Sequence, residues 1–126
     1  MTDRLFREVS EDLNQIQHEF LILHGLRWLR GNGFESEIDW EWNPRQTGTA
    51  DEPDLRGSLN GATLISAEAS ASELPGGMID TRMRETLEKL SRMPGQKFYF
   101  VRTDEMATRA RTKVTKANWP VRVVKV

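Results

Sequence analysis

Residues 52–73, EPDLRGSLNGATLISAEASASE, decide the fold because they contain two strand-like runs joined by a strong turn signal. The runs cover residues 54–59 and 62–70, and the Asn60-Gly61 dipeptide between them is typical of a tight hairpin turn. Asp54 opens the first run and Glu68 lies near the end of the second. Two carboxylates brought together across a hairpin are a divalent-metal site in outline. The stretch therefore predicts a β-hairpin that carries a candidate metal site.

Whether Asp54 and Glu68 meet depends on the register of this hairpin. A two-residue loop at 60–61 would place residue 54 opposite 67 and turn Glu68 to the other side of the sheet. A three-residue loop would place residue 54 opposite Glu68, and a β-bulge would have the same effect. The apolar pattern does not decide between these registers, because Leu64 and Ile65 are neighbours and point to opposite faces.

Periodicity predicts alternating helices and strands in the rest of the chain. Apolar residues recur every three or four positions from Leu5 to Leu23, which indicates a long amphipathic helix whose apolar stripe should face a sheet. The run KFYFV indicates a central strand. The predicted elements are helix 3–31, strand 34–42, strands 54–59 and 62–70, helix 78–93, strand 97–101, a helix capped by Thr103 that runs to about residue 116, and strand 121–126. This αβββαβαβ order predicts one α/β domain, residues 1–126, with a mixed central sheet flanked by helices.

Composition restricts the classes of function. Without cysteine the chain has no disulfide, no thiol nucleophile and no thiolate metal site. His18 and His24 lie six residues apart in the first helix, so we do not expect them to bind one metal together. No apolar run approaches the roughly 18–20 residues that cross a bilayer, and the N-terminal stretch lacks the apolar core of a secretion signal. We expect a cytoplasmic protein with no membrane partner.

The net charge of −1 hides an asymmetry between the two parts of the chain. Residues 1–75 hold 6 Lys and Arg against 14 Asp and Glu, whereas residues 76–126 hold 12 against 5. Near the C-terminus, Arg109, Lys113 and Lys116 share one face of the last predicted helix, and Arg102 precedes it. These four cations are candidate contacts to nucleic-acid phosphates, and the alternative is charge pairing within the domain.

Three acids are candidate ligands for Mg²⁺ or Mn²⁺: Glu19, Asp54 and Glu68. Glu19 borders the apolar stripe of the first helix, where a buried carboxylate would favour a nearby cation. A divalent cation held by carboxylates can activate water and neutralise a leaving oxygen in phosphodiester hydrolysis.

The element order, together with Glu19, the Pro53-Asp54 pair and Glu68-Ala69-Ser70, resembles the restriction-endonuclease-like superfamily, the PD-(D/E)xK nucleases, over nearly the whole chain. In that superfamily the acids bind Mg²⁺, and the lysine of the final triplet positions or polarises the attacking water. Glu19, Asp54 and Glu68 match this pattern, whereas Ser70 stands where the lysine would be. The resemblance implies a metal-dependent DNA endonuclease, and a homodimer, since small members often dimerise.

Ser70 leaves two hypotheses open, because a hydroxyl can hydrogen-bond a water molecule but supplies no positive charge. In the first, the chain is a DNA endonuclease in which Ser70 works with Arg82 or Arg84 of the following helix, where Lys89 is a further basic residue that could reach back. In the second, it is a catalytically inactive nuclease-like module that binds DNA or a protein partner. A protein partner would be bound in an immunity or antitoxin-like manner through the acidic stripe 35–41.

Overall fold

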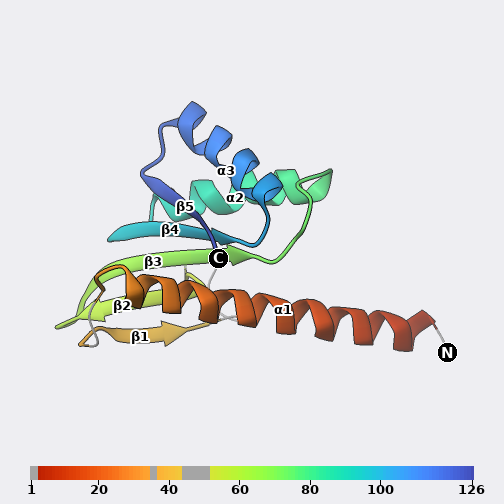
Figure 1. Cartoon of the computed structure of the whole chain (residues 1–126), viewed down its shortest axis with the longest axis horizontal. Helices are drawn as coiled ribbons and strands as arrows, with labels where there is room; N and C mark the ends of the chain where they lie inside the picture. Colours follow the sequence, from red (N-terminus) through yellow and green to blue (C-terminus); the bar gives the residue numbers. More distant parts are fainter. Residues whose placement is uncertain (1–2, 35–36, 44–51) are drawn as a thin grey trace.

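The computed structural model describes residues 3–34, 37–43 and 52–126, with side chains described from residue 13 onward. Within these ranges it has a mixed α/β architecture with the predicted αβββαβαβ order. The elements are α1 (Asp3–Gly31), β1 (Asp39–Trp42), β2 (Leu55–Leu59), β3 (Ala62–Ser70), α2 (Met78–Ser91), β4 (Gln96–Val101), α3 (Asp104–Ala117) and β5 (Val121–Lys125) (Figure 1). The prediction of an α/β chain with a mixed sheet flanked by helices is confirmed.

The five strands form one sheet in the order β1-β2-β3-β4-β5. The pairs β1–β2 and β2–β3 are antiparallel, whereas β3–β4 and β4–β5 are parallel. The apolar run at residues 97–101 therefore lies in an interior strand, as its composition predicts. Each parallel connection contains a helix, α2 between β3 and β4 and α3 between β4 and β5.

The helices cover opposite faces of this sheet (Figure 1). On one face α1 packs through Ile22 and Leu29 against Ile65, Phe98 and the rest of one core cluster. On the other face α2 and α3 enclose a second cluster. Its buried members are Met83, Leu87, Leu90, Met93, Tyr99, Val101, Met106, Ala107, Ala110, Val121 and Val123. The sheet is the middle of three layers. Side chains on one of its faces point toward α1, and those on the other face point toward α2 and α3.

The first helix is continuous, but the apolar stripe expected to face the sheet points elsewhere. Leu13, Ile16, Phe20 and Leu23 are exposed. The residues of α1 that pack on the sheet include Ile22 and Leu29, with Gly25 lying directly against Phe100. A Cβ atom on Gly25 would lie 2.5 Å from the Phe100 ring, so the glycine allows close packing of the helix on β4 instead of marking a bend. The prediction that the 13–23 stripe faces the sheet is wrong.

The predicted strand 34–42 is shorter in the structure, where β1 begins at Asp39. The backbone N–H of Phe34 donates to the carbonyl of Leu29 at 3.2 Å, and the Phe34 ring meets Phe98 at 5.7 Å between centroids. This contact with the end of α1 holds Phe34 outside the sheet. Residues 35 and 36 of the predicted strand lie outside the described ranges.

The other predicted boundaries agree closely with the structure. Thr103 caps α3, since its Oγ1 accepts a hydrogen bond from the backbone N–H of Met106 at 3.2 Å. Asn118 ends the same helix in a left-handed conformation with φ 55°. Across residues 3–34, 37–43 and 52–126, no helix combines the length and apolar character that a membrane span requires.

Candidate functional site

A β-bulge resolves the register of the hairpin. The turn contains two residues, Asn60 and Gly61, both with positive φ, and pairs Leu59 with Ala62. The pairing then shifts, because Ser58 pairs with Thr63 whereas Gly57 pairs with Ile65, which leaves Leu64 as the extra residue of β3. Beyond the shift, Leu55 pairs with Ala67. One residue further along, this register places Asp54 opposite Glu68.

The bulge lies against a tight turn before β4. Gly95 has φ 81°, and a Cβ atom there would lie 2.4 Å from the carbonyl carbon and oxygen of Leu64. The Ser66 hydroxyl donates to the carbonyl of Pro94 at 2.9 Å. Because a glycine alone fits this conformation and this approach, the 94–95 turn holds the bulged part of β3 in place.

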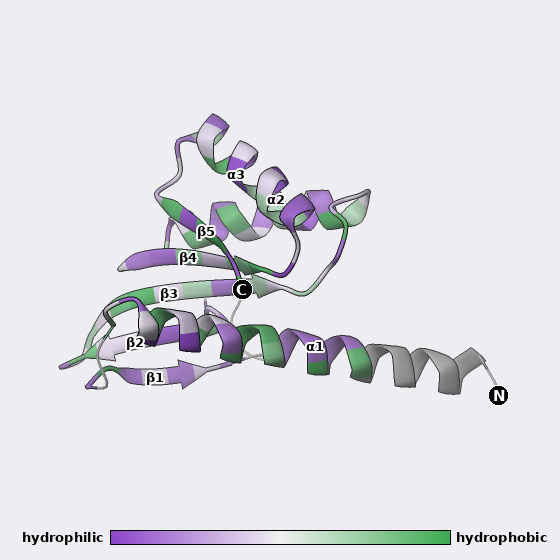
Figure 2. Ribbon diagram, viewed as in Figure 1, coloured by the Kyte–Doolittle hydropathy of each residue, from purple (hydrophilic) through white to green (hydrophobic). Residues whose placement is uncertain are grey.

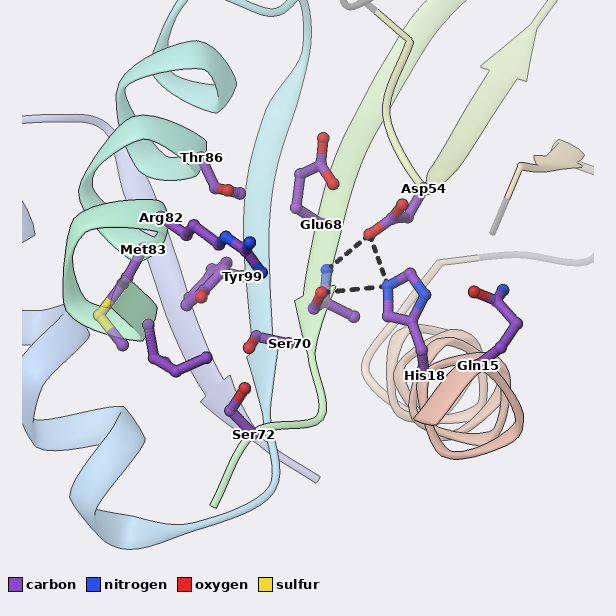
Figure 3. A pocket seen from close by; sticks show the side chains of 12 residues that line it. Gln15, His18, Asp54, Glu68, Ser70, Ser72, Arg82, Met83, Thr86 and Tyr99 are labelled. Carbon is purple, nitrogen blue, oxygen red and sulfur yellow. Dashed lines mark hydrogen bonds and ion pairs between the residues drawn. The ribbon is translucent and has the colours of Figure 1, made fainter. Parts of the chain in front are cut away.

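Asp54 is a buried carboxylate held by two donors. Its side chain is 2% exposed, and Oδ2 accepts a hydrogen bond from the backbone N–H of Ala69 at 3.0 Å. The Nε2 atom of His18 on α1 lies 3.1 Å from the same oxygen and 3.2 Å from the carbonyl oxygen of Ala69 (Figure 3). A carbonyl oxygen only accepts hydrogen bonds, so Nε2 carries the proton and donates. His18 thus joins α1 to the hairpin through the acid.

Glu68 is equally buried and has a lysine partner. Its side chain is 3% exposed, and Oε1 lies 2.9 Å from Nζ of Lys89 on α2. The Asp54 and Glu68 carboxyl groups are also hydrogen-bonded to each other. Two carboxyl groups and one ammonium group therefore form a connected cluster between β2, β3 and α2.

Burial and proximity move the pKa values of the two acids apart. Burial raises the pKa of Glu68 to about 8, with a further increase from the charge of Asp54, while Lys89 acts in the opposite direction. Burial by itself also raises the pKa of Asp54, but hydrogen bonds to His18 and Glu68 outweigh it, so the pKa of Asp54 is lowered overall. Near neutral pH the pair consequently favours one shared proton, and the pKa of Glu68 is the one that is raised.

The acid pair opens into a cavity of about 410 Å³ between α1, the C-terminal end of β3 and α2 (Figure 3). Its wall contains Asp54 and Glu68 together with Gln15, His18, Ala69, Ser70, Ser72, Ile79, Arg82, Met83, Thr86 and Tyr99. Burial raises the pKa of Tyr99 to about 12, so the phenol stays neutral, and it is hydrogen-bonded to Ser70. The cavity is lined mainly by polar side chains around the two acids.

The structure brings some of the predicted site residues together and separates others. Asp54, Glu68, Ser70 and Arg82 line the cavity. Arg84 lies on another side of α2, where it lines a separate hollow of about 570 Å³. Glu19 is half-buried, accepts a hydrogen bond from Gln15 Nε2 at 3.5 Å and is not part of the cavity wall.

Sequence reasoning missed the role of His18 and favoured Arg82 and Arg84 over Lys89, the residue that reaches Glu68. Arg82, Thr86 and Lys89 are spaced by four and three residues and therefore share one face of α2, whereas Arg84 is about 200° from Arg82 around the helix. This spacing was the available signal for Lys89. No local pattern singles out His18, because its contacts are with residues 36 and 51 positions away.

The acid pair matches part of what a divalent cation requires. Mg²⁺ in proteins is commonly held by one or two carboxylates, with water and substrate phosphate completing its shell. Asp54 and Glu68 supply two such carboxyl groups in one cavity. A bound cation would displace the proton that they share. In the part of the chain that the structure describes, no cluster of three or more His, Cys, Asp or Glu residues is arranged for a metal. The predicted third ligand, Glu19, is thus not placed with the other two.

The predicted phosphate contacts are mostly engaged in ion pairs. Arg109 and Lys113 both reach Asp80 on α2, at 3.3 and 3.0 Å. Arg102 pairs with Glu73. Lys116 lines the hollow between α2 and α3 that also contains Arg84 and Arg109. Arg109 and Lys113 thus help to dock α3 on α2.

The site as a whole is a buried acid pair with a lysine from α2 and a histidine from α1, at the end of a cavity with Ser70 and Arg82 on its wall. The geometry combines groups that bind cations with groups that bind anions. Comparison with protein-family models, curated proteins and solved structures found no match to this chain.

Proposed function

We propose that this chain is a metal-dependent DNA endonuclease of the restriction-endonuclease-like fold, in which Lys89 supplies the positive charge that Ser70 lacks. One observation carries the proposal: Lys89 Nζ lies 2.9 Å from Glu68 Oε1, and Glu68 shares its cavity with Asp54. Lys89, on the helix that follows the hairpin, thus reaches Glu68. Ser70 lies two residues after Glu68 on the same strand.

The arrangement of the elements supports the same proposal. A helix precedes an antiparallel three-stranded meander, and two parallel strands with intervening helices complete the mixed sheet. Asp54 immediately precedes β2 and Glu68 lies near the end of β3, where the hairpin adjoins the parallel part of the sheet. This is the position that the resemblance to PD-(D/E)xK nucleases predicts for them.

Asp54 and Glu68 would hold Mg²⁺ or Mn²⁺, which when bound supplies electrophilic stabilisation of the phosphate and helps to activate water. The reaction adds water across a phosphodiester: a bond forms from the water oxygen to phosphorus, one P–O ester bond breaks, and the products are a phosphomonoester and a free hydroxyl. The residues of the chain have to orient the acids, place the water and bind the phosphate.

Four residues around the acids are suited to these tasks. His18 fixes the orientation of the Asp54 carboxylate through Oδ2. Lys89 keeps an ammonium group beside Glu68, where it stabilises negative charge that develops on attack. Arg82 lines the cavity and is a candidate donor to a phosphate oxygen. The Ser70 hydroxyl, hydrogen-bonded to Tyr99, is placed to contact a water molecule.

The test is cleavage of supercoiled plasmid and of branched DNA with Mg²⁺ or Mn²⁺. The proposal expects metal-dependent nicking or linearisation that EDTA abolishes and that Asp54→Asn reduces by on the order of 10² or more, since it removes a charged ligand. Glu52→Gln serves as the matched control, because this acid is exposed and lies two residues from Asp54. It should cleave like the wild-type chain.

A second outcome would support the inactive module instead. In that case the exposed acids Glu37, Asp39 and Glu41, near and on β1, and the exposed Lys116 of α3 are the candidate binding surfaces. DNA that is retarded in a gel but not cut, with no metal binding that Asp54→Asn removes, would exclude the enzyme. Absence of both cutting and retardation would exclude DNA as the partner.

A further inference from the structure

The outer face of α1 carries four large apolar side chains that the domain does not cover. Leu13, Ile16, Phe20 and Leu23 are between 44% and 59% exposed. At about 100° per residue they lie roughly half a turn from the side of α1 that holds Ile22 and Leu29 in the core. In the coloured part of α1 in Figure 2, apolar and polar residues alternate along the helix.

The spacing of these four residues is that of a helix-pairing seam. Intervals of three, four and three residues place them at the a and d positions of a heptad repeat. In the sequence the same intervals continue upstream to Val9 and Phe6. A narrow a/d stripe fits one neighbouring helix, whereas helices that pack on a sheet show a wider apolar face. A hollow of about 360 Å³ formed by Leu23, Leu26, Arg27 and Arg30 adjoins the C-terminal end of the seam.

The length of α1 leaves room for such a neighbour. The helix has 29 residues and is therefore about 43 Å long. Only its C-terminal part lies over the sheet, and its N-terminal end extends beyond the rest of the molecule (Figure 1). A partner helix can therefore lie along the seam without meeting α2 or α3, which cover the opposite face of the sheet.

The charges along α1 indicate which helix fits. Residues 3–19 hold five acids and two arginines, a net charge of −3, whereas residues 20–31 hold two arginines and no acid, a net charge of +2. A second copy of α1 in antiparallel orientation sets the acidic part of each helix beside the basic part of the other, and it also opposes the two helix dipoles. A parallel copy would set like charges together.

We propose that two copies of this chain form a dimer through antiparallel packing of the α1 seams. A two-fold axis between Ile16 and Phe20 pairs Ile16 with Phe20 of the second copy and Leu13 with Leu23, so every layer joins an a position to a d position. His18 and Gln15 line the cavity from another side of the helix, which stays open in this dimer. The inference stands on the seam alone and does not depend on the proposed nuclease activity.

Light scattering coupled to gel filtration tests the assembly. The wild-type chain should elute with twice the monomer mass of 14.5 kDa, and Ile16→Glu/Phe20→Glu should elute as a monomer with unchanged circular dichroism. The control is Leu74→Glu/Met78→Glu, since both residues are at least as exposed but lie outside α1. It should remain a dimer.

The orientation is tested by disulfide cross-linking, for which the absence of cysteine in the chain is an advantage. When Leu13→Cys and Leu23→Cys chains are mixed and oxidised, the antiparallel dimer should yield mainly the mixed 13–23 cross-link. Same-residue cross-links in its place would overturn the antiparallel arrangement. A wild-type monomer, a folded Ile16→Glu/Phe20→Glu dimer, or a monomer that binds phosphatidylglycerol vesicles through the seam would overturn the dimer itself.

Discussion

Among single residues, Asp54 depends most strongly on its hydrogen-bond partners. A buried carboxylate is costly unless hydrogen bonds replace its water shell. Besides the hydrogen bond that it shares with Glu68, one donor comes from the backbone of its own hairpin, at Ala69, and the other from His18 on a distant helix. The orientation of the acid is therefore set by the packing of α1 on the sheet, and loss of either donor should affect both stability and the site.

His18→Ala should destabilise the fold by about 1–3 kcal/mol, because it leaves the buried Asp54 oxygen with one donor fewer. The measurement is urea unfolding followed by circular dichroism. His24→Ala is the matched control, since His24 is exposed on the same helix and should change stability little. Equal effects of the two substitutions would show that the contact between His18 and Asp54 contributes nothing to stability.

Glu68 should give the metal-free protein a distinct pH dependence. Its pKa is raised from 4.5 to about 8, so between these values the folded state binds more protons than the unfolded state. Stability from this group is therefore present at low pH and is lost as pH rises toward 8. In EDTA the melting temperature of the wild-type chain should fall over this interval relative to Glu68→Gln, which has no proton to lose. Parallel pH profiles of the two proteins would contradict the raised pKa.

Among the elements, the hairpin and the turn before β4 depend on each other. The extra residue of β3, Leu64, brings Asp54 into register with Glu68, and Gly95 lies directly against its backbone. The bulge near the turn of the hairpin thus determines whether Asp54 and Glu68 meet at its open end. The site is consequently sensitive to changes about thirty residues away in sequence.

Gly95→Ala tests this dependence, and Gly61→Ala is its control. Both glycines have φ 81°, so alanine is strained at each, but only at Gly95 would the new Cβ collide with backbone, 2.4 Å from Leu64. Gly95→Ala should destabilise the chain more than Gly61→Ala, and by more than about 1 kcal/mol in total. The measurement is urea unfolding. An equal loss at both positions would show that the bulge does not need the glycine.

The elements were predictable from sequence to a greater extent than their relations. Local signals located the Asn60-Gly61 turn and the Thr103 cap because each acts within a few residues. A bulge was one of the registers that the sequence left open, but its presence at Leu64 was not predictable, since the residue that lies against it, Gly95, is about thirty residues away. Periodicity likewise showed that α1 has an apolar stripe but not which surface covers it. On α2 the sequence favoured Arg82 and Arg84, but the packing of that helix brings Lys89 to Glu68.

In the whole molecule, the acidic and basic parts of the chain meet at the candidate site. The pair Glu68–Lys89 joins the acidic part of the sequence to the basic part inside the domain. Other cations of the basic part are neutralised within it, as where Arg109 and Lys113 reach Asp80. The charge asymmetry of the sequence therefore reflects internal pairing as well as any surface for a polyanion.

The central claim is that Lys89 replaces the lysine that the strand lacks at Ser70, and moving the lysine back tests it most directly. The measurement is the rate of plasmid cleavage with Mg²⁺ by the wild-type chain, by Lys89→Met and by Lys89→Met/Ser70→Lys. Lys89→Met should lower the rate by about 10²–10³, the usual effect of removing one charge-stabilising group. Because Ser70 lines the same cavity, the second substitution should restore at least part of the lost rate. Wild-type cleavage by Lys89→Met, or no cleavage by the wild-type chain itself, would contradict the claim.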